Sequence, residues 1–148
     1  MRHLVAVALL AACDRAPARV MAKEPTRSME AHTDLQRLRR YFDAPAAAQS
    51  ARWIVLPRGM PSVAPGPTDT VLWALVALPE SAWAELGALG PVESRALPPD
   101  VARALLPAGA PPSVSGPSYD ISSRVLNPYE GDRAIRLHDA LLLELTSR

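Results

Sequence analysis

The chain has 148 residues, which is the size of one domain, and 49% of them are hydrophobic, which is enough for one core. Its 16 prolines are about twice the ordinary usage of 5%, a composition that predicts a compact fold with many proline-rich loops. The net charge of +1 excludes a strong global attraction to nucleic acid, so we predict no nucleic-acid partner.

The N-terminus has the composition of a secretory signal. Arg2 and His3 precede a short apolar segment, residues 4–12, which is followed by Cys13. The segment is too short to span a bilayer, which needs about 20 apolar residues. Cys13 is the only cysteine, and a single cysteine in an exported protein requires a partner or a modification.

The sequence Leu-Ala-Ala-Cys at residues 10–13 resembles the lipobox of bacterial lipoproteins. The resemblance implies that residues 1–12 are a signal peptide and that Cys13 is the lipid attachment site. It also implies a membrane anchor without a transmembrane helix, in the bacterial cell envelope and facing the periplasm. Asp14 directly follows the cysteine, and in enteric lipoproteins an acidic residue there is associated with retention in the inner membrane.

Two alternatives to the lipobox remain open at this stage. Only twelve residues precede Cys13, whereas signal peptides usually have about 15–30. Residues 4–12 are therefore also compatible with a buried helix that ends at an ordinary cysteine. Alternatively, translation begins at Met21 or Met29, which would give a cytosolic protein.

Downstream of Cys13 the composition predicts a flexible tether and then one folded domain. Residues 13–32 have few bulky apolar side chains and mixed charges, so they cannot bury enough surface to offset the entropy of ordering. The first helix is expected from a cap at Thr33 or Asp34 to about Phe42. The rest of the chain, residues 33–148, is predicted to be a single globular α+β domain.

The apolar stretch 70–78 predicts the central strand of the sheet. It is rich in β-branched and aromatic residues, and both of its alternating faces are apolar, as in a strand covered on both sides. A short strand is predicted at residues 52–56, and a proline-rich loop at 57–68. Residues 65–69, which lead into this strand, resemble a segment of small bacterial proteins that have no assigned function.

Helices and a hairpin are predicted after the central strand. Residues 79–89 begin with Pro-Glu and place Trp83, Leu86 and Leu89 on one face, which predicts a helix, and residues 99–106 predict another. Residues 108–118 read as a loop, 119–126 as a weak strand or irregular segment, and 127–132 as a turn. Residues 133–137 and 140–146 alternate around His138-Asp139, which predicts a β-hairpin.

The sequence contains no motif that specifies an enzyme or a cofactor. No spacing of His or Cys residues suggests a metal site, and the glycines form neither a phosphate loop nor a dinucleotide fingerprint, so we predict no metal and no cofactor. A nucleophile, base and acid can be combined from Ser118 or Ser122, His138, and Asp69 or Asp120, but no motif supports the set. The tryptophans 53, 73 and 83 occupy positions typical of a core, although aromatic residues also anchor binding grooves.

These observations predict a small α+β domain with a mostly antiparallel sheet of about four strands and two or three short helices. The function expected first is that of a non-enzymatic, lipid-anchored envelope protein that binds a partner or assists an assembly. An inhibitor or immunity-type lipoprotein is the second hypothesis. A small hydrolase that uses His138 is the least favoured.

Overall fold

The computed structural model describes residues 30–58 and 69–147, apart from the side chain of Asp132. Within these ranges six strands form one antiparallel sheet in the order β1-β2-β6-β5-β4-β3. In chain order the elements are α1 (Leu35–Leu38), β1 (Ser50–Pro57), β2 (Thr70–Ala77), the 3-10 helix η1 (Glu80–Glu85), β3 (Gly87–Ala96), α2 (Pro99–Leu105), β4 (Ser113–Asp120), the 3-10 helix η2 (Ser122–Arg124), β5 (Tyr129–Leu137) and β6 (Ala140–Ser147).

The predicted α+β fold with about four strands is wrong, because the described domain is mostly β. The two additional strands, β3 and β4, lie where the sequence predicts the end of a helix and a loop. Both carry glycine and proline, which are unusual inside a sheet. The strands tolerate them because Pro91 and Pro117 face each other in the ladder, and because β3 is an edge strand with two register shifts.

The helix predicted at residues 79–89 is only a short 3-10 turn. Pro79 precedes η1 as expected, but the backbone becomes extended at Leu86, with φ −103° and ψ 135°, and Gly87 begins β3. Trp83 and Leu86 are buried, whereas Leu89 lies on β3 with 69% of its surface exposed. The predicted helical face of these three residues is therefore wrong.

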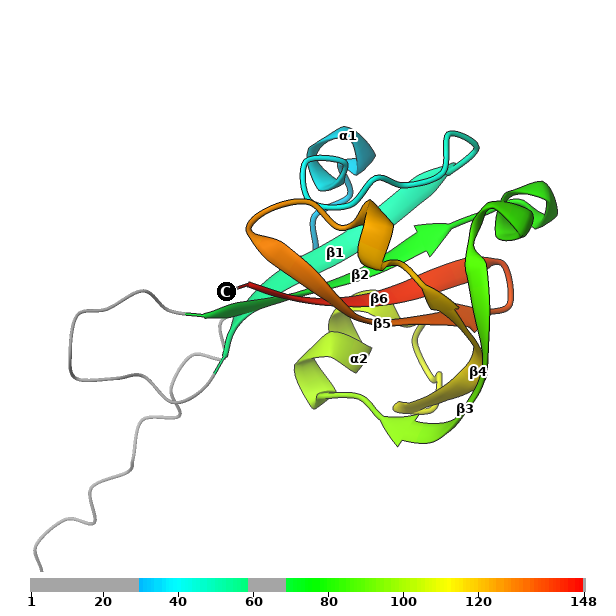
Figure 1. Cartoon of the computed structure of the whole chain (residues 1–148). Coiled ribbons are helices and arrows are strands. Elements are labelled where there is room, and N and C mark those ends of the chain that lie inside the picture. The colour runs from blue at the N-terminus through cyan, green and yellow to red at the C-terminus, as the bar shows by residue number, and fades with distance from the viewer. Residues whose placement is uncertain (1–29, 59–68, 148) are drawn as a thin grey trace, which may run out of the picture.

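The central strand is confirmed as β2, between β1 and β6. Its alternating residues pack into two different clusters: Leu72, Ala74 and Val76 on one face of the sheet, and Trp73 with its neighbours on the other. The segment around α1 covers the first face and α2 covers the second, as Figure 1 shows. The apolarity on both faces of β2 thus follows from two layers of cover.

The hairpin and two of the predicted helices are confirmed in position, although one helix is shorter. β5 and β6 pair around the two-residue connection His138-Asp139, where His138 takes a φ of 54°. The N-cap is Asp34, whose carboxylate accepts a hydrogen bond from the Arg37 backbone N–H at 3.0 Å. The helix α1 then stops at Leu38 because the chain turns to carry buried Phe42 into a bridge with Val125.

Strands β3 and β4 bend away from the other four strands, and α2 lies inside the bend (Figure 1). Among the described residues, one pair, Ser118 with Ile135, joins β4 to β5 in register. Close to it Gly116 packs tightly against the Arg136 carbonyl of β5. Further along β4, Val114 packs in the α2 cluster and forms one wall of the cleft described next.

Candidate functional site

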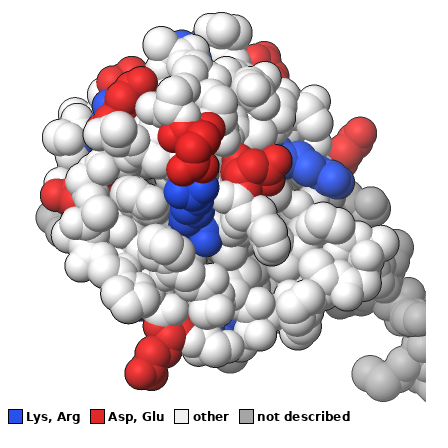
Figure 2. Space-filling view, turned by 90° about the vertical axis from the view of Figure 1, so that its right-hand side faces the viewer, with Lys and Arg blue, Asp and Glu red and all other residues white. Residues whose placement is uncertain are grey.

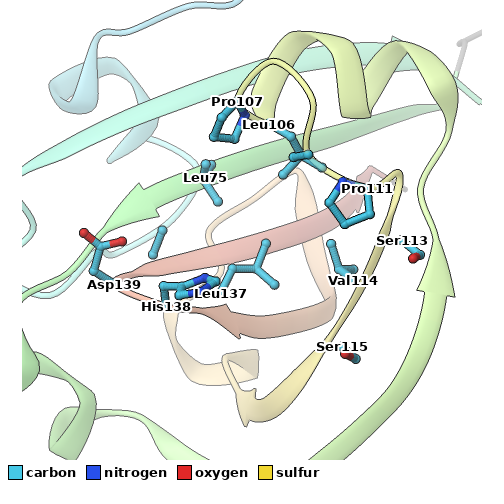
Figure 3. A pocket seen from close by; sticks show the side chains of 12 residues that line it. Leu75, Leu106, Pro107, Pro111, Ser113, Val114, Ser115, Leu137, His138 and Asp139 are labelled. Carbon is cyan, nitrogen blue, oxygen red and sulfur yellow. The ribbon is translucent and has the colours of Figure 1, made fainter.

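An open cleft of about 400 Å³ lies beside the tip of the β5–β6 hairpin. Leu75 of β2, Leu137 of β5 and Ala140 of β6 line it from the sheet, residues 106–111 close it from the α2–β4 connection, and Val114 lines it from β4. Figure 3 shows apolar side chains surrounding the opening and His138 with Asp139 at the hairpin tip on one side. We call this site the hairpin cleft.

The sheet carries small side chains beyond the end of α2, and one of them, Ala140, lines the hairpin cleft. Ser50, Ala77 and Ala140 are in register across β1, β2 and β6, so they form one row on the face that α2 covers. Helix α2 has only seven residues and ends at Leu105, and Pro107 prevents its continuation. The connection after Pro107 therefore passes over a hollow.

A second hollow of about 530 Å³ adjoins the hairpin cleft and shares four lining residues with it: Leu75, Pro107, Asp139 and Ala140. The remaining wall comes from Thr33, from the start of β1 at residues 50–52, from Ala77 and from Leu105. We call this site the β1 hollow. Its wall differs from that of the hairpin cleft in containing an arginine, Arg52, beside the hydroxyl residues Thr33 and Ser50.

Five of the ten arginines in the described residues have an acidic partner. Arg95 contacts Glu144 at 2.7 Å, Arg136 pairs with Glu80, and Arg124 lies within 4 Å of two carboxylates. On the face seen in Figure 2, some acidic and basic side chains adjoin one another, other acidic side chains stand alone, and wide uncharged areas lie between them. The other five arginines, Arg37, Arg39, Arg40, Arg52 and Arg58, form no ion pair within the described residues.

Arg52 and Asp139 differ from these paired residues. Both line the β1 hollow, and neither side chain forms a hydrogen bond or an ion pair with another residue in ranges 30–58 and 69–147. A cation and an anion with no partner among the described residues therefore line one hollow with an apolar floor.

The structure does not bring the candidate catalytic residues together. The Ser122 hydroxyl donates to Asp120 at 2.7 Å, and this bond together with the Ser122 N–H lowers the pKa of the Asp120 carboxyl. The Ser118 hydroxyl donates to the carbonyl of Gly90. Asp120 and His138 lie near opposite ends of the β4–β5 pair, roughly 15 Å apart at about 3.3 Å per residue.

The other predicted side chains have structural positions. Trp53, Trp73 and Trp83 are 2%, 4% and 6% exposed, so they pack in the core and do not line a groove. His32 bonds to both backbone groups of Trp53 and its ring lies 4.4 Å from the indole, at the outer edge of β1. Asp69 precedes β2, and its carbonyl accepts a bond from the Arg58 N–H.

Sequence reasoning missed Arg52, Ser113 and Ser115 as lining residues. Their proximity depends on the register of β1 and on the existence of β4, neither of which the sequence indicated. Cys13, Asp14, Met21, Met29 and most of the predicted loop at 57–68 lie outside the described residues. Among the residues that the structure describes, no group of three His, Cys, Asp or Glu side chains could hold a metal ion, and no helix has the length and apolarity needed to cross a membrane.

No protein-family model, no curated protein and no solved structure matches this chain. The functional argument therefore rests on the geometry of the hairpin cleft and the β1 hollow.

Proposed function

We propose that the protein is a non-enzymatic binding module, held at the periplasmic face of a bacterial membrane by a lipid on Cys13. The observation that supports binding is the hairpin cleft. Its walls are mostly apolar, its opening is at the molecular surface, and its volume of about 400 Å³ falls in the range of ligand sites, roughly 300–1,000 Å³. The polar residues at its rim, including His138, form no nucleophile–base pair among the described residues.

A fluorescent apolar anion, anilinonaphthalene sulfonate, tests the cleft. We would use the full chain with Cys13→Ala, which removes the proposed lipid. We expect enhanced, blue-shifted fluorescence that is lost in Ala140→Phe, because this side chain would fill the hollow next to Leu75. Ala88→Phe on exposed β3 is the matched control and should keep the signal.

The near-ultraviolet circular dichroism of each variant must show native tertiary packing, since loosely packed states also bind this dye. Fluorescence that is equal in Ala140→Phe and in the parent chain would contradict the cleft as the binding site.

Metabolic labelling with an alkyne analogue of palmitate tests the anchor. The supporting features are the apolar segment 4–12 and the single cysteine in a lipobox-like context. The wild-type chain should incorporate label and sediment with membranes, and Cys13→Ala should do neither. If label is absent, or survives in Cys13→Ala, the anchor is refuted, and the two alternatives replace it: a buried helix at residues 4–12, or a start at Met21 or Met29 with a cytosolic product.

Inner-membrane retention is the narrower part of this proposal, and it depends on Asp14. Fractionation of inner and outer membranes should recover the wild-type chain in the inner fraction and Asp14→Ser in the outer fraction. Recovery of both chains in the same fraction would refute the role of Asp14 while leaving the lipid anchor in place.

A further inference from the structure

We propose that the hairpin cleft and the β1 hollow together bind the carboxyl end of a short peptide whose last side chain is apolar. This inference rests on the proposed binding function and adds the chemical class of the ligand. It is argued from three features in a row: an anion-binding group at Arg52, an unpaired acceptor at Asp139, and an apolar hollow beyond Asp139.

The anion-binding group lies on the wall of the β1 hollow. Arg52 is exposed and unpaired within the described ranges, and the hydroxyl residues Thr33 and Ser50 line the same hollow. A guanidinium binds a carboxylate through two parallel hydrogen bonds, and hydroxyl groups supply further donors. A free peptide carboxylate is therefore a good fit to this wall.

Asp139 restricts which anions can bind. Its residue borders both hollows and its side chain has no partner among the described residues, while its own carbonyl accepts the Leu78 N–H at 2.8 Å. A second carboxylate nearby would repel a simple fatty acid. A peptide avoids this cost because its backbone N–H groups can donate to Asp139 while its carboxylate remains at Arg52.

The apolar hollow then accepts the side chain. Leu75, Leu137 and Val114 face one another across the cleft, and a space of about 400 Å³ is wide enough for a leucine or phenylalanine side chain. Because the row of Ser50, Ala77 and Ala140 is small, the backbone of the peptide can lie close to the sheet. In a terminal residue the carboxylate, the N–H donor and the apolar side chain are all attached to one Cα, so a single residue can present the three groups to the two adjoining hollows.

Isothermal titration calorimetry on the full chain with Cys13→Ala tests the inference with three probes: acetyl-Ala-Ala-Leu with a free carboxylate, the same peptide as its amide, and octanoate. The free acid should bind, and the amide and octanoate should each bind at least tenfold more weakly. Arg52→Gln and Asp139→Asn should each lower the affinity for the free acid by roughly 10–100-fold, the usual effect of losing a charge-assisted hydrogen bond.

Matched controls separate these effects from a general change of charge. Arg40→Gln removes an exposed arginine, and Glu93→Gln an exposed carboxylate, neither of which lines the two hollows. Both controls should bind the free acid as the parent chain does.

Each outcome has a distinct meaning. Equal binding of acid and amide, or an unchanged affinity in Arg52→Gln, overturns the carboxylate site. Tighter binding of octanoate than of the peptide overturns the peptide and favours an apolar acid. If no peptide binds, but the naphthalene sulfonate binds the parent chain and not Ala140→Phe, this inference fails and the proposed function stands. If neither binds, both fail.

Discussion

Gly116 is the residue at which a single methyl group should disturb the fold most specifically. A Cβ built there would lie 2.5 Å from the backbone oxygen of Arg136, closer than the 3.0 Å limit that real Cβ atoms respect. That oxygen belongs to β5, which is also paired to β6 along its length, so it cannot move without shifting the hairpin. Gly116→Ala must therefore push β4 away from β5 close to their registered pair, Ser118 with Ile135.

The magnitude has two parts. Gly116 has a φ of +155°, and strain of an alanine at such an angle costs of order 1–3 kcal/mol. The clash with a fixed carbonyl adds about 1–3 kcal/mol, the usual cost of overpacking. We expect Gly116→Ala to lower the free energy of unfolding by about 2–6 kcal/mol.

Gly90→Ala is the matched control. Gly90 also has a positive φ, +131°, and lies in β3, but a Cβ there meets nothing within 4 Å. Gly90→Ala should therefore lose stability only through backbone strain, and the difference in unfolding free energy between the two variants measures the cost of the clash. Urea unfolding with comparable m-values measures both. If the loss of unfolding free energy in Gly116→Ala is within about 0.5 kcal/mol of the loss in Gly90→Ala, the close approach of β4 and β5 is refuted, because independent sites already differ by that much.

Two further predictions follow from the core and from the ionisable groups. Phe42→Ala should destabilise the domain by about 3–5 kcal/mol in urea unfolding, because Phe42 is fully buried. Leu126→Ala, at a residue that is 41% exposed, should cost far less, and similar costs for the two would contradict the packing of Phe42 in the core cluster with Val125. Ser122→Ala should raise the Asp120 pKa toward its ordinary value of 3.8, as read by carboxyl carbon chemical shifts, because the Ser122 hydroxyl is the first cause of the lowered pKa. Because the pKa of Asp120 is lower in the folded state, ionised Asp120 stabilises the fold above pH 3.8, and this contribution is lost as the pH falls through the folded pKa. The parent chain and Ser122→Ala should therefore differ in free energy of unfolding above pH 3.8 and converge below it.

The sequence predicted well the elements whose signal is local. β2 has the length, the β-branched residues and the flanking prolines of a covered strand, and the alternation on both sides of His138 indicates a hairpin without reference to anything distant. Asp34 likewise caps α1 through a contact three residues away. In each case the residues that determine the structure are neighbours in the chain.

β3 and β4 could not be predicted in this way, because their stability comes from their partner strand. Gly90, Pro91, Gly116 and Pro117 are breaker signals when each segment is considered alone. They become compatible with a sheet only when the two strands are aligned so that Pro91 faces Pro117. Such an alignment is a property of the pair, which no window of the sequence contains.

The candidate site was missed for a related reason. Ser50, Ala77 and Ala140 are ordinary small residues, separated by up to 90 positions in the sequence, and only the register of three strands makes them one row. Arg52 and Asp139 likewise meet at one hollow through the pairing of β1, β2 and β6. The residues of the site are therefore neighbours across strands, whereas a motif search examines residues that are neighbours along the chain.

If the row of Ser50, Ala77 and Ala140 forms the site, a larger side chain in this row should weaken ligand binding and stabilise the fold. Ala77→Val adds two methyl groups above the floor of the β1 hollow, at a strand position where β-branched residues are favoured. With about 0.8 kcal/mol for each buried carbon, the domain should gain roughly 1 kcal/mol or slightly more in unfolding free energy. The acid peptide should bind at least tenfold more weakly, since the new methyl groups occupy the space of its backbone.

Ala84→Val in η1, at an exposed position, is the control. It should neither raise the free energy of unfolding nor weaken binding of the acid peptide. A variant Ala77→Val that is less stable would show that the hollow is already filled by its neighbours. A variant that is more stable and still binds would place the ligand elsewhere. Only the combination of higher stability and lost affinity fits a hollow that the fold keeps open for a ligand, because stabilising substitutions at a binding site are commonly opposed by function.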